Sequence, residues 1–159
     1  MNGIRYRTRQ FWFAFSAAPL TQHQKQSASE LLTPAQMTLF SRLQASEQRH
    51  SLRVLQTLQQ EGHTNPDLLI AALLHDIGKI IIPDQILNKR GRLTPEEWAL
   101  MQQHPVAGEK ILSGISHLQA ARPYVLYHHE HWDGTGYPEG LQGREIPLEA
   151  RILAIIDVY

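Results

Sequence analysis

The sequence contains no cysteine among its 159 residues. Disulfide frameworks and thiolate metal sites are therefore excluded, and any metal ion must be held by histidine and carboxylate side chains. The chain also lacks net charge, because 15 Lys and Arg residues balance 15 Asp and Glu residues. Without a global field to attract a nucleic-acid polymer or an anionic membrane, an anionic substrate has to be recognised by a local site.

Long apolar runs are missing too. No stretch reaches the roughly 18 consecutive apolar residues of a membrane-spanning helix, so no membrane span is expected. Hydrophobic residues make up 42% of the chain and charged residues 19%, which is typical of a globular protein with one domain and a core. The lack of cysteine fits a reducing compartment, and we expect a cytoplasmic protein.

Residues 1–32 have the composition of an N-terminal extension to a domain over 33–159. Basic residues precede FWFAFSAAPL at positions 11–20, a weak likeness to a signal peptide, but this apolar part is short and is broken by Ser16. We favour a helix laid on the domain, or a surface that contacts a signalling partner or a second copy of the chain.

Capping signals and apolar spacing predict an all-α fold. Pro105 directly follows His104, which predicts a bend at that point. No segment alternates as a strand does. Helices are expected over about 33–60, either continuous or interrupted near Ser46, and over 65–78, 94–104, 116–130 and 146–159, with a turn-rich segment at 134–146.

Histidine is over-represented, with nine residues. Two short motifs place two side chains that can bind metal next to each other. In HDIGK, His75 and Asp76 point about 100° apart on a helix, so they can reach around one metal ion or bridge to a second. Lys79 returns to the same side, where a fixed ammonium suits a phosphate. The alternative is a structural His at a helix end with a capping Asp.

The second motif is YHHEHWDGTGYP, residues 127–138. His128 and His129 would repel each other if both were protonated, and a site with two metal ions removes that conflict because both rings are then neutral ligands. Asp157 lies in the apolar stretch RILAIIDVY and is either an inward-facing ligand or a solvent-facing acid. His50 and His104, taken singly, are more often core or surface residues.

The segments AALLHDIGK, PDQILNK, LTPEEW, HPVAGEKIL and YHHEHWDGTGYPEGLQGREIPLEARILAIIDVY resemble the HD-GYP branch of the HD superfamily of metal-dependent phosphohydrolases, over roughly residues 48–159. The resemblance implies an HD-domain helical bundle with an inserted GYP loop. It also implies a metal-dependent phosphodiesterase that hydrolyses cyclic di-GMP to pGpG and/or GMP in bacterial second-messenger signalling. The expected cofactors are two divalent ions, iron or manganese.

The resemblance also assigns residues to roles. Asp76 would bridge the two ions, and Lys79 would hold a phosphate oxygen; these two form the catalytic pair. Tyr137 would stack on a guanine base. The implied metal ligands are His50, His75, Asp76, His104, His128, His129 and Asp157, and the implied substrate-binding residues are Lys79, Asp133, Gly134, Gly136, Tyr137 and Pro138.

Two departures from the family pattern affect this interpretation. Some members carry a Glu one turn before the first His, which supports a third metal ion; this chain has Ser46 there, with Glu47 off register, so two ions are expected. The family also continues beyond the position of Tyr159, so the domain is expected to be incomplete at its C-terminus. The alternatives are therefore an HD phosphohydrolase for another nucleotide or phosphate ester, or a truncated, inactive module that binds the messenger or a partner.

Overall fold

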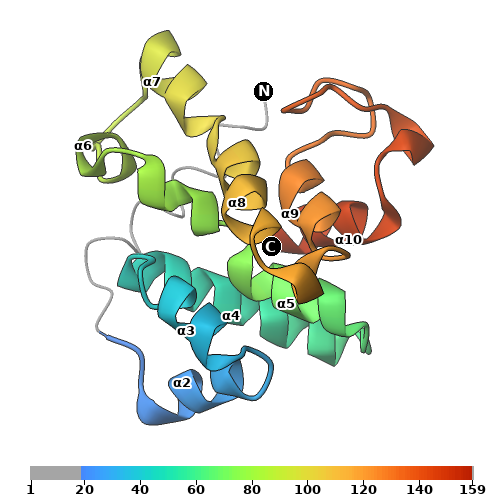
Figure 1. Ribbon diagram of the computed structural model, residues 1–159. Coiled ribbons are helices and arrows are strands. Elements are labelled where there is room, and N and C mark those ends of the chain that lie inside the picture. Colours follow the sequence, from blue (N-terminus) through green and yellow to red (C-terminus); the bar gives the residue numbers. More distant parts are fainter. Residues whose placement is uncertain (1–18, 159) are drawn as a thin grey trace.

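The computed structural model describes residues 19–158, which fold into a bundle of short helices (Figure 1). Within those residues the only β feature is an isolated bridge between Asp133 and Gln142. The all-α prediction is confirmed. The helices are α2 (Gln22–Ser29), α3 (Pro34–Phe40), α4 (Ala45–Gln60), α5 (Pro66–Leu74), α6 (Asp84–Leu87), α7 (Pro95–Met101), α8 (His104–Ser113), α9 (Arg122–Tyr127) and α10 (Leu148–Asp157), with 3-10 turns η1 (Ile77–Ile81), η2 (Ser116–Leu118) and η3 (Gly143–Glu145).

The sequence signals for helix starts act as predicted. Thr33 and Thr94 each accept a hydrogen bond from the backbone N–H three residues later, and the Gln or Glu at that position bonds back, forming capping boxes for α3 and α7. Asn65 caps α5 without a reciprocal bond: its side-chain oxygen accepts from the N–H groups of Asp67 and Leu68. These caps satisfy backbone donors that the first turn of a helix leaves unpaired.

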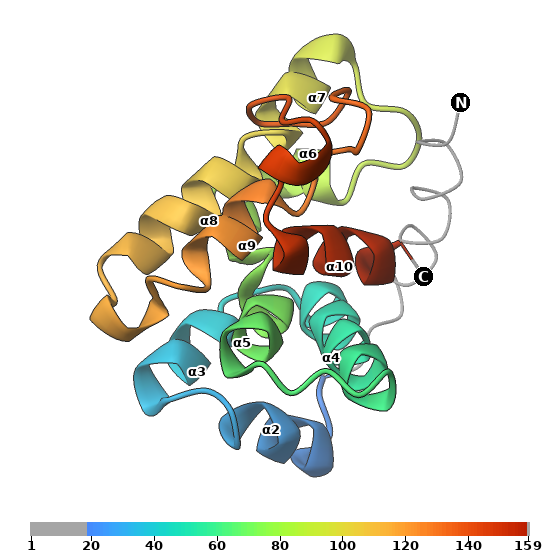
Figure 2. The ribbon, with the colours of Figure 1, turned by 90° about the vertical axis from the view of Figure 1, so that its right-hand side faces the viewer.

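Helices α4 and α5 pack against each other, as do α8 and α9, and α10 contacts α4, α5 and α9. Figure 2 shows α10 between these two pairs, with α2 and α3 at one end of the molecule and α6, α7 and the long loop after α9 at the other. Leu68, Leu73 and Leu74 of α5 are fully buried. Each such side chain contributes about 1.5–3 kcal/mol by leaving water, so α5 is the centre of the core.

Several helix predictions were wrong in their bounds. The segment 33–60 is interrupted, but at residues 41–44 rather than near Ser46: α3 ends there and the chain turns into α4. The helix expected to reach Gly78 ends at Leu74 and continues as the 3-10 turn η1. The segment 116–130 holds η2 and the short α9 rather than one helix.

The bend predicted at Pro105 lies slightly earlier, at residues 102–103 between α7 and α8, because α8 begins at His104 and Pro105 lies in its first turn. A proline is tolerated there, since the N–H that it lacks has no partner within the helix. The correction matters for function because it places His104 at the N-terminal end of a helix that packs directly on η1.

Part of the predicted extension packs on the domain. Leu20, Ala28 and Leu32 belong to the hydrophobic core, and residues 22–29 form α2. The boundary at residues 32 and 33 stays a prediction. The basic-aromatic segment, with its signal-like and partner-binding interpretations, lies outside the described residues, and among residues 19–158 no helix has the length and apolarity needed to span a bilayer.

Candidate metal centre

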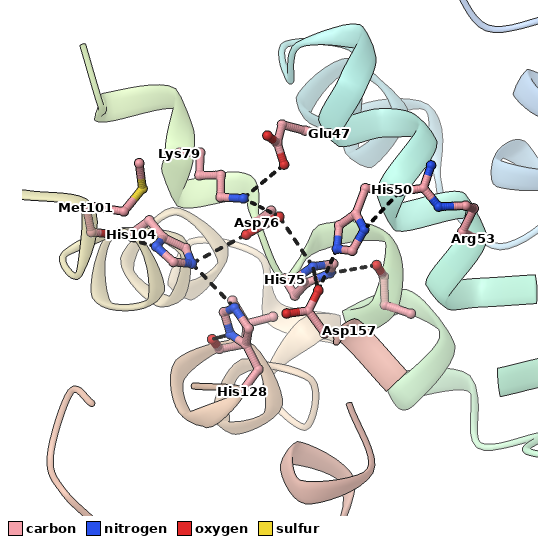
Figure 3. Close-up of polar contacts among 12 residues, drawn as sticks. Glu47, His50, Arg53, His75, Asp76, Lys79, Met101, His104, His128 and Asp157 are labelled. Carbon is pink, nitrogen blue, oxygen red and sulfur yellow. Dashed lines mark hydrogen bonds and ion pairs between the residues drawn. The ribbon is translucent and has the colours of Figure 1, made fainter. Parts of the chain in front are cut away.

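The predicted metal ligands come from five separate places in the chain and meet in the interior (Figure 3). His75 follows the last residue of α5 and Asp76 precedes η1, so both stand where one helix passes into the next. Asp157 is the last residue of α10. Six of the seven are buried, and His129 is half-buried: His50, His75, Asp76, His104, His128 and Asp157 are exposed by 8% or less.

These ligands form two groups that share one carboxylate. The first group is Asp76, His104, His128 and His129, and the second is His50, His75 and Asp76. Within each group the ligand atoms lie within 4.8 Å of one another. Asp157 Oδ1 adds to the second group, at 2.5 Å from His50 Nε2 and 3.3 Å from His75 Nε2.

Asp76 lies between the two groups, with one oxygen toward each. Its Oδ1 is 3.4 Å from His104 Nε2, and its Oδ2 is 3.4 Å from His75 Nε2. Because its two oxygens face different groups of ligands, this carboxylate can bind one ion through each atom. The structure therefore supports the predicted bridging position of Asp76.

Three histidines have their tautomer fixed by the backbone. The Nδ1 atoms of His75, His104 and His128 lie 2.7–2.9 Å from the carbonyl oxygens three residues earlier in the chain. A carbonyl oxygen only accepts, so each Nδ1 carries a proton, and each Nε2 is the atom that faces the site. Such an arrangement is the usual support of metal-binding histidines.

The charges in the centre favour a bound cation. Burial lowers the pKa of His104 to about 4 and that of His128 to about 3, so both rings are neutral near pH 7, as metal ligands must be. Burial opposes the ionisation of Asp76, but Lys79 and His75 hold its pKa well below its usual range. The centre therefore places the neutral imidazoles of His104 and His128 beside the ionised carboxylate of Asp76.

The surroundings of His75 favour a positive charge at its ring. Burial alone would lower its pKa, but Asp76 and Asp157 outweigh burial and raise that pKa to about 10. Among residues 19–158 its buried Nε2 makes no well-formed hydrogen bond, although carboxylate oxygens of Asp76 and Asp157 lie 3.4 Å and 3.3 Å away. A buried imidazole nitrogen facing two carboxylates fits a divalent cation, which would take the position of a proton there. The residues present thus fit a centre for divalent ions made of His and carboxylate ligands.

Lys79 lies beside the centre, as predicted, and is 7% exposed. Its ammonium nitrogen is 2.7 Å from Asp76 Oδ2 and 2.9 Å from Glu47 Oε2. Burial opposes its charge, but the two carboxylates raise its pKa above the ordinary value, so it stays protonated. Glu47 received no role from the sequence, because its position is one residue away from the family's register.

The GYP segment, Gly136 to Pro138, packs directly against the chain at His129, one of the two adjacent histidine ligands. A side chain at Gly136 would place its Cβ 2.3 Å from His131 N and 2.6 Å from His129 O, so only glycine allows this close passage of two backbones. The Tyr137 N–H donates to His129 O at 3.2 Å, and the Tyr137 ring stacks on the His129 ring with centroids 4.8 Å apart. Pro138 follows through a cis peptide bond.

This packing gives Tyr137 a contact that the sequence interpretation did not foresee. Its ring stacks on His129 and makes T-shaped contacts with Trp98 and His104 at centroid distances of 6.0 Å and 6.5 Å. Stacking on a guanine stays a prediction. Asp133 Oδ1 accepts hydrogen bonds from the backbone N–H and the hydroxyl of Thr135, so this carboxylate shapes the turn itself.

Glu130 fixes the same loop through hydrogen bonds, and the sequence assigned it no role. It is 3% exposed, and its Oε1 accepts the backbone N–H groups of Glu139 and Gly140 at 2.7 Å and 3.0 Å. The Glu in HHE was a usable signal, since a buried acid needs partners. The partners of Glu130 could not be predicted from the sequence, because they depend on how the loop folds back.

Glu130→Ala is expected to loosen this loop, because the backbone N–H groups of Glu139 and Gly140 lose a charged acceptor, at a cost of about 2 kcal/mol. Trypsin should then cut after the exposed Arg144 about tenfold faster or more. Glu139→Ala is the matched control, because it removes an exposed carboxylate from the loop and keeps the backbone N–H. Equal cleavage rates for both variants would contradict the role given to Glu130.

Comparison with known proteins agrees with the geometry. The HD domain family model matches residues 21–159. The cyclic di-GMP phosphodiesterase PA4108 of Pseudomonas aeruginosa is 42% identical over 144 residues, which cover 84% of this chain and 35% of that protein. The 3'3'-cGAMP-specific phosphodiesterase 2 of Vibrio cholerae is 50% identical over 91 residues, 56% of this chain and 17% of that protein.

A solved structure agrees at the level of the fold. Bd1817, an HDG"Y"P protein from Bdellovibrio bacteriovorus, superposes with a TM-score of 0.60 and 21% identity, over 96% of this chain and 66% of its own. The chain spans about a sixth to a third of the length of the two curated relatives above. The resemblance to the HD-GYP branch is confirmed, and the chain belongs to the HD domain family.

Proposed function

We propose that the chain is a metal-dependent phosphodiesterase that hydrolyses cyclic di-GMP, to pGpG and/or GMP, in bacterial second-messenger signalling. One observation carries this proposal: two groups of His and carboxylate ligands share Asp76, and the Lys79 ammonium lies against that same carboxylate. The names of the relatives support the cyclic dinucleotide as the substrate class. We further propose that the protein acts in the cytoplasm.

In this proposal each of the two groups of ligands holds one ion. His104, His128 and His129 would hold one ion, His50, His75 and Asp157 the other, and Asp76 both. Iron or manganese suits such a set, because it contains nitrogen and oxygen donors and no thiolate. When bound, the ions would supply Lewis-acid activation of the phosphodiester and of the attacking water.

The remaining residues bind and enclose the substrate. Lys79 would donate to a non-bridging phosphate oxygen, where its charge stabilises the negative charge that builds during hydrolysis. Asp133, Gly136, Tyr137 and Pro138 would form the wall of the pocket on the side of His129, since the GYP segment packs there.

A second cyclic dinucleotide is a specific alternative substrate. The relative named as specific for 3'3'-cGAMP is 50% identical to this chain in the aligned region. The two messengers differ in one purine base, so they present the same phosphates to the ions and to Lys79. Discrimination between them therefore has to come from contacts to the base.

The test is turnover of each dinucleotide by the purified chain loaded anaerobically with iron or with manganese, with the products separated by chromatography. Linear products that disappear after chelation and return on adding the ion are the expected result. The ratio of kcat/KM values for cyclic di-GMP and cGAMP assigns the preferred messenger. Two bound ions per chain with no product from either dinucleotide would overturn the proposal in favour of another phosphate ester or a binding module.

A further inference from the structure

Glu47 is the acidic residue of the centre that belongs to neither group of ligands. It lies in the first turn of α4, three residues before His50, and its Oε2 is 2.9 Å from the Lys79 ammonium. Figure 3 shows that ammonium between the carboxylates of Glu47 and Asp76. The two groups among residues 19–158 that could hold a metal ion do not include Glu47.

The Glu47–Lys79 pair differs from an ordinary surface ion pair. The side chain of Lys79 is 8% exposed and that of Glu47 is 18% exposed. An exposed pair stabilises little because water screens it, but a buried ammonium that loses a partner stays uncompensated at a large cost. The pair also joins α4 to η1 across 32 residues of sequence, so both ends are attached to elements that carry ligands.

The two carboxylates that accept hydrogen bonds from Lys79 differ in their other contacts: Asp76 belongs to both groups of ligands and Glu47 to neither. Asp76 Oδ2, the oxygen that accepts from Lys79, is also the oxygen that faces His75. An ion held by His75 and Asp76 draws on the same oxygen and weakens its hydrogen bond to the ammonium. Among residues 19–158 Glu47 belongs to neither group of ligands, so its hydrogen bond from Lys79 persists when Asp76 is engaged.

We propose that Glu47 is a positioning residue, which keeps the Lys79 ammonium at the edge of the metal centre while Asp76 binds the ions. Without Glu47 the long Lys79 side chain gains rotamers that point away from the phosphate. This inference rests on the proposed function, because it concerns the group that would bind the substrate phosphate. Its effect should appear in catalysis and not in metal content.

The kinetic test is a double-mutant cycle on the metal-loaded chain, with Glu47→Gln, Lys79→Met and the double variant. Glu47→Gln is expected to lower kcat/KM about 10- to 100-fold, as loss of an outer partner does, and Lys79→Met about 100-fold or more. In the double variant the first change should add nothing, because Glu47 acts through Lys79. Effects that multiply would overturn the inference.

Glu61→Gln is the matched control. It removes the same charge from the other end of α4, where Glu61 is exposed and lies outside the centre. Its turnover and metal content should equal those of the wild type. Metal content, measured by mass spectrometry, should also be unchanged in Glu47→Gln; a loss of one ion per chain would instead identify Glu47 as a ligand and overturn the inference.

A second readout does not depend on turnover. In zinc-loaded protein with 15N-labelled lysine, the Lys79 ammonium should give an NMR signal protected from exchange, assigned by its loss in Lys79→Met. That signal should disappear in Glu47→Gln and persist in Glu61→Gln. An unchanged signal in Glu47→Gln would overturn the inference, even if wild-type chain hydrolysed neither dinucleotide and the proposed function failed.

Discussion

Replacing Asp76 with Asn is expected to reduce turnover by about a thousandfold or more and to lower the metal content to one ion per chain or fewer. Asn keeps the shape of the side chain but offers one oxygen and no charge, so it cannot bind an ion on each side. About 4 kcal/mol of lost transition-state stabilisation corresponds to a thousandfold in rate. The measurements are kcat/KM for the preferred dinucleotide and bound metal per chain.

The change also removes the charge that Lys79 and His75 face, so folding needs its own control. Thermal unfolding and circular dichroism of Asp76→Asn should show a helical, cooperatively folded chain. Asp67→Asn removes a carboxylate from the first turn of α5, away from the centre, and should keep full turnover and metal content. A folded Asp76→Asn variant with two ions and near-normal turnover would show that the centre is assigned wrongly.

Much of the centre could be anticipated from residue types and motifs. HDIGK and HHE contain their ligands next to each other, and the family resemblance adds His50, His104 and Asp157 from positions 24 or more residues away. The sequence alone left these three ambiguous, since a lone His or Asp on a helix has many uses. Only the packing of α4, α8 and α10 around α5 and η1 brings them together.

The residues that escaped prediction share one physical cause. Glu47 binds Lys79 across 32 residues, and the partners of Glu130 lie nine and ten residues further on in a returning loop. Local spacing contains no information on such partners. The same holds for Tyr137, whose stacking on His129 depends on the close backbone passage at Gly136. Contacts that a loop makes when it folds back are beyond any argument from helical periodicity.

The position of His104 depends on a second close passage of backbones. A Cβ at Gly78 would lie 1.8 Å from His104 O and 2.5 Å from Gly108 N, and both are main-chain atoms that cannot rotate away. Gly108 faces Gly78 in return, so two glycines let η1 and α8 approach closely. This approach places His104 Nε2 3.4 Å from Asp76 Oδ1.

Gly78→Ala is therefore expected to push α8 away from η1, with an overpacking cost of about 3 kcal/mol. For a chain of this size that corresponds to a fall in Tm of roughly 6–12 °C. Gly114→Ala is the control, because a Cβ there meets nothing within 4 Å, and its Tm should stay within about 2 °C of the wild type.

Metal binding should respond to Gly78→Ala as well as stability does. Moving α8 separates His104 from Asp76, so the group with His128 and His129 loses a ligand while the His50–His75 group keeps its own. Calorimetric titration with manganese should then show one weakened site and one retained site. A variant with the wild-type Tm and two intact sites would mean that η1 and α8 can move apart without cost, and that their close contact does not position His104.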